Sequence, residues 1–191
     1  LDSAPFAALR AWPLWARVFI GGLKNLLCGA TTVMQHGPPH KPLYRRDFPV
    51  RVLKEYGWAH SLHFDTDEEI VRSYQSTPKE WPWFIHLAEG TDSVARGEYS
   101  RLKKLGCMGK NTVAIHGVGL TNQDEDNLSH LILCPTTNLY LLGKTLASTA
   151  RFHHSGLALG SDSRLTGQGD LLDELRTYYE LFGQPKGLLT P

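Results

Sequence analysis

Short apolar runs alternate along the chain with segments of helical periodicity. Runs of this length, each closed by glycine, proline or a polar residue, predict buried strands. Six of them lie at about 30–34, 58–64, 83–87, 111–116, 128–134 and 157–160. Apolar positions at three- and four-residue steps predict helices over 5–28, 47–56, 92–106, 141–152 and 170–182, with one more beginning at Asp65 or Thr66. Pro13 is expected to divide the first helix into two pieces. The alternation predicts an α/β fold with parallel strands.

Three of the predicted strands carry a chemically active side chain where they end. His86 lies in the run 83–87, with Glu89 and Gly90 just after it. The run 111–116 ends in His116, and the run from residue 157 continues through glycine and serine to Asp162. In a parallel α/β barrel the carboxyl ends of the strands meet at the pole that holds the active site. We therefore expect these side chains to converge on one cavity.

Two imidazoles and a carboxylate suit a metal or proton-transfer site. His86, His116 and Asp162 are the donor types that zinc or a similar divalent ion prefers. Such an ion lowers the pKa of a bound water from 15.7 to about 7. Glu89, just outside the strand, is placed to carry a proton between that water and a leaving nitrogen. The alternative for each histidine is a hydrogen-bonded core residue, and for Asp162 a cap of the following loop.

Composition narrows the function classes. The net charge of +1 offers no electrostatic footprint for nucleic acid or for a membrane surface. No apolar run approaches the ~20 residues needed to cross a bilayer. Three cysteines without disulfide or zinc-finger spacing indicate free thiols in a reducing compartment, which predicts a cytoplasmic protein. We expect a small-molecule substrate. The sequence does not distinguish a monomer from a homo-oligomer. The chain starts without methionine inside a predicted helix, so we expect a fragment or a processed chain.

Four motifs, in this order, resemble the amidohydrolase superfamily, in the branch of cytosine deaminases and triazine hydrolases. They are Ile-His-Leu-Ala-Glu-Gly at 85–90, His-Gly-Val-Gly-Leu-Thr at 116–121, Cys-Pro-Thr-Thr-Asn at 134–138 and Leu-Gly-Ser-Asp-Ser at 159–163. Gly-Ala-Thr-Thr-Val at 29–33 is also similar to the second strand of that family. The resemblance covers about residues 20 to 176.

The resemblance implies a (β/α)8 TIM-type barrel as a single domain over 1–191, and a role for each matching residue. His86 would be the metal ligand from the fifth strand, and Asp162 the ligand and base from the eighth. Glu89 would shuttle protons, and His116 would orient the hydrolytic water or the reacting group of the substrate. Asn138 falls on the seventh-strand loop that often lines the substrate pocket.

His60 is a further candidate for substrate contact. His60 and His63 are three residues apart, so they point to opposite faces of a strand and only one can face the barrel interior. Packing or substrate contact is the expected role there, rather than metal binding.

Two departures from the family pattern make the barrel incomplete in this chain. The family's first strand carries a His-x-His pair that supplies two metal ligands, and no His-x-His occurs here. Six strands are predicted where a full barrel has eight, and the flanking β-sandwich is absent. We therefore expect a vacant or under-coordinated metal site, unless His36, His40, His60 or His63 replaces the missing pair.

These features together predict a metal-dependent hydrolase or deaminase that acts on carbon–nitrogen bonds of a small, cyclic substrate. Zinc is the expected metal, with iron and manganese open. The alternative is a non-catalytic or metal-free relative or fragment that serves as a binding module. The chain contains no P-loop, no strand-linked Gly-x-Gly-x-x-Gly and no Gly-x-Ser-x-Gly.

Overall fold

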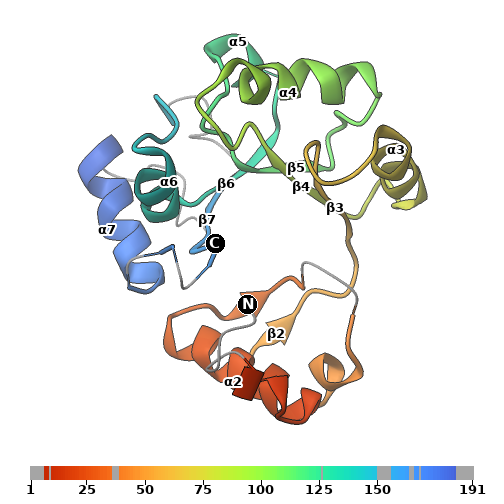
Figure 1. Ribbon diagram of the computed structural model, residues 1–191, viewed down its shortest axis with the longest axis vertical. Coiled ribbons are helices and arrows are strands. Elements are labelled where there is room, and N and C mark those ends of the chain that lie inside the picture. Colours follow the sequence, from red (N-terminus) through yellow and green to blue (C-terminus); the bar gives the residue numbers. More distant parts are fainter. Residues whose placement is uncertain are drawn as a thin grey trace. The chain divides into compact units, whose positions relative to one another are not determined.

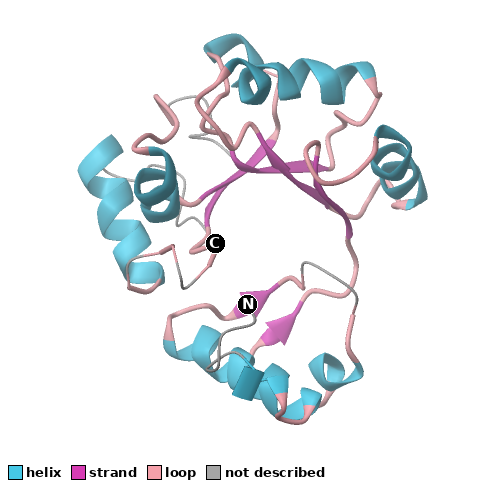
Figure 2. Ribbon diagram, viewed as in Figure 1, coloured by secondary structure: helices cyan, strands magenta, loops and turns pink. Residues whose placement is uncertain are grey.

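The computed structural model describes residues 7–8, 10–35, 39–125, 127–149, 156–163, 166–167 and 169–183. The chain forms two compact units, Leu1–Lys54 and Glu55–Pro191. Both contain helices and strands (Figure 2). Each unit is described by itself below.

The first unit pairs two short strands in parallel. It contains α2 (Leu14–Leu27), β1 (Thr32–Val33), the 3-10 helix η1 (Lys41–Tyr44) and β2 (Arg51–Val52), and β1 pairs with β2. Pro13 occupies the N-cap of α2, and helical residues lie before it as well, in agreement with a helix divided at Pro13. Phe19 of α2 packs edge-on against Phe48, with ring centroids 6.3 Å apart.

The helix predicted over 47–56 is wrong. The backbone amides of Arg51 and Leu53 donate to the carbonyls of Thr31 and Val33, so this segment extends beside β1. Pairing with a neighbouring strand overrides a weak helical periodicity that also contains Pro49.

The second unit is built on a five-stranded parallel sheet. Its strands are β3 (Gly57–Ser61), β4 (Trp83–Leu87), β5 (Thr112–His116), β6 (His130–Leu133) and β7 (Leu157–Leu159), hydrogen-bonded in that order. The helices are α3 (Asp67–Ser76), α4 (Ser93–Lys104), α5 (Asn122–Glu125), α6 (Pro135–Leu142) and α7 (Leu171–Phe182). Figure 1 shows the sheet curved, with these helices on its outer side.

The apolar runs form strands because both of their faces are covered. All five residues of β5 are buried, and Trp83, Ile85 and Leu87 of β4 are fully enclosed in the core with Leu131 of β6. Near-continuous burial is typical of parallel strands between two covered faces. The predicted parallel α/β class is confirmed.

Helix starts follow the capping residues of the sequence. Thr66 caps α3 in a reciprocal capping box with Glu69, Asp92 caps α4, and Asp170 caps α7. The helix predicted over 141–152 is wrong in its described part, because α6 begins at Pro135 and ends at Leu142, where Gly143 adopts a left-handed conformation with φ 64°.

The described residues form seven strands where the sequence predicts six, and β2 is the additional one. In the part of the chain that the structure describes, the strands form two sheets and no closed barrel. The fold is that of an incomplete TIM-type barrel, while a single domain over 1–191 stays a prediction. No described helix is both long and apolar enough to cross a membrane.

Candidate functional site

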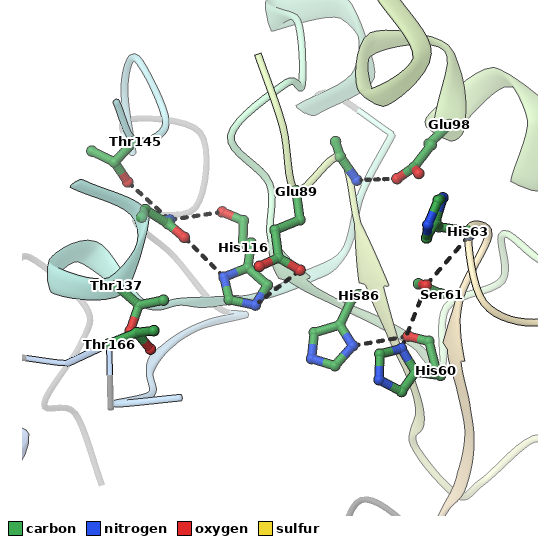
Figure 3. A network of polar contacts seen from close by, with 12 residues as sticks. His60, Ser61, His63, His86, Glu89, Glu98, His116, Thr137, Thr145 and Thr166 are labelled. Atoms are coloured by element: carbon green, nitrogen blue, oxygen red, sulfur yellow. Dashed lines mark hydrogen bonds and ion pairs between the residues drawn. The ribbon is translucent and has the colours of Figure 1, made fainter. Parts of the chain in front are cut away.

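Three histidines from adjacent strands lie side by side. His86 of β4 stacks on His116 of β5, with ring centroids 5.3 Å apart and planes 26° apart. The His60 ring of β3 lies 5.0 Å from the His86 ring. All three residues come from the carboxyl-terminal part of parallel strands, so the sheet register brings them together (Figure 3). The sequence predicted His86 and His116 at strand ends, and the structure places them there.

The His86 ring is oriented by the backbone of the neighbouring strand. Its Nδ1 lies 2.9 Å from the carbonyl oxygen of His60, which can only accept, so Nδ1 carries the proton. In the neutral ring the lone pair then belongs to Nε2. A histidine whose Nδ1–H donates to a backbone carbonyl is oriented in the way typical of metal-binding histidines. His86 therefore suits the ligand role predicted for it.

His116 is buried and held from both sides. Its side chain is 1% exposed, and its Nδ1 lies 2.8 Å from Oδ1 of Asn138, while Nε2 lies 3.6 Å from a Glu89 oxygen. The Asn138 amide nitrogen donates to Thr145 Oγ1 at 3.2 Å and to the His116 carbonyl at 3.5 Å, which fixes Oδ1 toward the ring. Figure 3 shows the Glu89 carboxylate turned toward His116. This geometry permits proton exchange between Glu89 and His116 through a small shift or one water.

Asp162 lies beyond the end of β7, three residues after Leu159, and it is exposed. Its carboxylate and those of Glu174 and Glu89 all lie near the buried Cys134. Burial first, and then these negative charges, raise the pKa of the Cys134 thiol far above its usual range. Cys134 is a shared neighbour of these carboxylates, which places Asp162 and Glu89 in one region of the unit.

The strand-end residues have unusual backbone conformations. Ala88, His116 and Asp162 have φ of 55°, 74° and 50°, and they are the non-glycine residues with positive φ in the described ranges. Side chains other than glycine adopt this region at a cost, and such residues gather at active sites and ligand clamps. Two of the three, His116 and Asp162, are residues that the sequence singled out, and Ala88 directly precedes a third, Glu89.

A complete metal site is not formed by the side chains that the structure describes. No three His, Cys, Asp or Glu groups among them are arranged to hold an ion. His86 and Asp162 fit as two ligands by their chemistry, and further ligands would be needed. His36 lies outside the described residues, and His40 belongs to the first unit. The metal, catalytic and substrate-binding roles of the predicted residues stay predictions.

The predicted substrate contacts have different surroundings. His60 is half-buried beside His86 and Phe64, at ring distances of 5.0 and 4.7 Å. Asn138 is 1% exposed, and its side chain bonds to His116 and Thr145. That geometry favours an orienting role for Asn138 over direct substrate contact.

Sequence reasoning missed two carboxylates that support this region. Glu98 of α4 accepts a hydrogen bond from the Ala88 amide at 2.7 Å. Glu174 of α7, 1% exposed, accepts from the amide of Thr136 at 3.0 Å and from its hydroxyl. Burial raises the pKa of both carboxyls, and the hydrogen bonds oppose that rise. The sequence did contain a signal for both residues, because each is an acidic residue next to the apolar positions of an amphipathic helix.

Three solved structures of similar fold are an adenosine deaminase, an amidohydrolase and a triazine hydrolase variant. The chain is similar to a zinc-bound adenosine deaminase from Xanthomonas campestris, at 20% identity and a TM-score of 0.59, over 72% of this chain and 34% of that one. It is also similar to an amidohydrolase from Brucella melitensis, at 22% identity and a TM-score of 0.54, over 69% of this chain and 31% of that one. A triazine hydrolase variant is similar at 16% identity and a TM-score of 0.58, over 88% of this chain and 37% of that one.

No protein-family model and no curated protein matches the chain. The chain spans about a third of the length of these three structures. At these identities the likeness establishes the fold, and the chain has the α/β fold of these amidohydrolase-type enzymes.

Proposed function

We propose that the chain belongs to a metal-dependent hydrolase of the amidohydrolase superfamily, in the branch of cytosine deaminases and triazine hydrolases. It would act on carbon–nitrogen bonds of a small cyclic molecule. The observation that carries the proposal is the contact of Glu89 with the buried His116, next to His86, at strand ends of this fold. The adenosine deaminase, the amidohydrolase and the triazine hydrolase of similar fold support the reaction class.

Each side chain has a role in this proposal. His86 and Asp162 would hold a divalent ion, zinc foremost, and the ion would supply a water acidic enough to lose a proton near neutral pH. Asp162 accepts that proton, and Glu89 delivers one to the leaving nitrogen. His116 orients the reacting group of the substrate, and Asn138 holds its ring in place. His60, beside His86, contacts the substrate ring. The three free cysteines support a cytoplasmic location.

The test is ammonia release from cytosine, adenosine and a 2-amino-1,3,5-triazine, with zinc present. Glu89→Gln keeps the shape of the side chain and removes its proton transfer. We expect kcat to fall by about 10² or more, because general acid–base catalysis contributes at least that much. Zinc content, measured by elemental analysis, should stay unchanged, since Glu89 is assigned no ligand role.

Glu68→Gln is the matched control, because Glu68 is an exposed glutamate on the neighbouring helix α3. It should leave turnover as in the wild type. Loss of zinc in Glu89→Gln would show that Glu89 is a ligand and that the shuttle role is misassigned. No ammonia release from any of the three compounds would favour a non-catalytic binding module.

A further inference from the structure

The backbone amide and the backbone carbonyl of Ala88 are both hydrogen-bonded. The Ala88 amide donates to Oε2 of Glu98 at 2.7 Å, and its carbonyl accepts from the Gly119 amide at 2.8 Å. Ala88 itself is 0% exposed and has φ of 55°. The residue directly after Ala88 is Glu89, whose carboxylate lies 3.6 Å from His116 Nε2.

The direction of Glu89 follows from the conformation of Ala88. A β-strand that continued through Ala88 would send the chain onward along β4, away from the end of β5. The left-handed residue turns the chain instead, and Gly90 then packs so closely on α4 that a Cβ there would lie 2.8 Å from the Cβ of Ala95. Alanine adopts this conformation at a cost, so the surrounding contacts must hold it.

Glu98 is suited to this task by its place on α4. Ala95, Tyr99 and Leu102 form the buried stripe of the helix, and Glu98 lies half-buried at its edge. An ionised carboxylate that accepts a backbone amide makes a shorter and stronger hydrogen bond than a neutral acceptor. Arg101, His63 and Glu89 are the charged or titratable groups nearest to it, and Arg101 is itself bonded to Asp67 and to the Leu62 carbonyl.

We propose that Glu98 is a positioning residue: by accepting the Ala88 amide it holds the left-handed turn that aims Glu89 at His116. The structural half of this inference stands on the contacts above. The catalytic half rests on the proposed function, in which Glu89 transfers the proton.

The experiment compares Glu98→Gln with Glu98→Met. Both side chains match glutamate in length, but glutamine retains an oxygen for the Ala88 amide and methionine does not. Crystal structures give the Glu89–His116 separation and the φ of Ala88, and hydrogen exchange gives the protection of the Ala88 amide. We expect Glu98→Gln to preserve all three and Glu98→Met to lose them. In the ammonia-release assay, kcat of Glu98→Met should fall about 10-fold to 100-fold with little change in KM, as for a misplaced catalytic group.

A second substitution tests whether the effect passes through Ala88. Glycine adopts positive φ without the penalty of alanine, so Ala88→Gly in the Glu98→Met background should recover part of the lost kcat. Recovery of kcat together with the Glu89–His116 separation distinguishes this effect from a general change in stability. The control Glu68→Met changes an exposed glutamate of α3 and should alter none of these measurements.

An unchanged Glu89–His116 separation and a protected Ala88 amide in Glu98→Met would overturn the proposal. If that variant does not fold, rapid exchange of the Ala88 amide in the wild type would overturn it, and slow exchange that Glu98→Gln retains would support it. Absence of ammonia release by the wild type would remove the proposed function and leave the structural readouts to decide on Glu98.

Discussion

Hydrogen bonds between buried polar side chains hold the histidine rings of the candidate site in place. His116 and Asn138 are each 1% exposed, so the hydrogen bond of 2.8 Å between them is shielded from water. A buried donor that loses its acceptor retains the full cost of desolvation. His116 also holds φ of 74°, and its contacts must offset that conformation as well.

Asn138→Leu is expected to lower the free energy of unfolding by about 1–3 kcal/mol, because His116 Nδ1–H loses its buried acceptor. Urea denaturation measures the change. Asn138→Asp retains an oxygen for His116 and should cost less than the leucine variant. Asn122→Leu, at an exposed asparagine of α5, is the control and should stay within about 0.5 kcal/mol of the wild type. A leucine variant as stable as the wild type would show that His116 finds another acceptor.

The sequence indicated the individual site residues better than their contacts. Apolar runs that end in histidine mark strand tips, and His86 and His116 lie there. Their partners are distant in the chain: Asn138 is 22 residues from His116, and Glu98 is 10 residues from Ala88. Such pairs depend on strand register and helix rotation, which composition and spacing do not specify. The left-handed conformation of Ala88 likewise had no local signal, since alanine rarely adopts it.

At the scale of elements, capping residues predicted boundaries well and periodicity alone did not. Thr66, Asp92 and Asp170 each begin the helix expected after them. The helix α6 was missed although proline opens it and Gly143 closes it. That arrangement of proline and glycine is itself a helix signal, but the predicted helix was placed over 141–152 from its apolar spacing instead. The strand β2 was missed because two residues are too few to show alternation.

Helices α6 and α7 are joined by a buried carboxylate, which makes their packing dependent on pH. Burial raises the pKa of Glu174 above its ordinary value. The folded protein therefore binds this proton more readily than the unfolded chain, and stability falls as pH rises from the ordinary glutamate pKa through the raised one. Below that window the group is protonated in both states and contributes no difference.

Glu174→Gln removes this titration. We expect the variant to gain stability relative to the wild type as pH rises through the window, measured by urea denaturation at a series of pH values from about 4 to about 8. Glu180→Gln, on the exposed side of α7, is the control and should show no such trend. A constant difference between Glu174→Gln and the wild type would mean that the Thr136 hydrogen bonds cancel the effect of burial.

At the scale of the whole molecule, the parallel α/β class followed from the alternation of apolar runs and amphipathic segments. Three structures at 16–22% identity share the fold, so the fold is retained where most residues differ. The strand count was harder to predict, because the strands at the margins are short: β1 and β2 have two residues each, and β7 has three. The apolar runs of the central strands are long enough to be recognised from sequence alone.

Metal binding tests whether these strand ends act as one site. A ligand that binds only the folded state stabilises it by about 2.7 kcal/mol at a hundred times its dissociation constant. We expect zinc to raise the Tm of the protein in a concentration-dependent manner, with a midpoint weaker than that of a closed catalytic site, since no three ligand groups converge in the described part of the chain.

His86→Asn should abolish most of that zinc-dependent rise, because His86 is the proposed metal ligand, with its ring oriented by the His60 carbonyl. His130→Asn is the matched control: His130 begins β6, at the opposite end of a parallel strand, and its variant should retain the rise. Differential scanning calorimetry against a zinc series gives both results. A full rise in His86→Asn, or its loss in His130→Asn, would mean that zinc binds elsewhere in the molecule and that the strand ends are not its site.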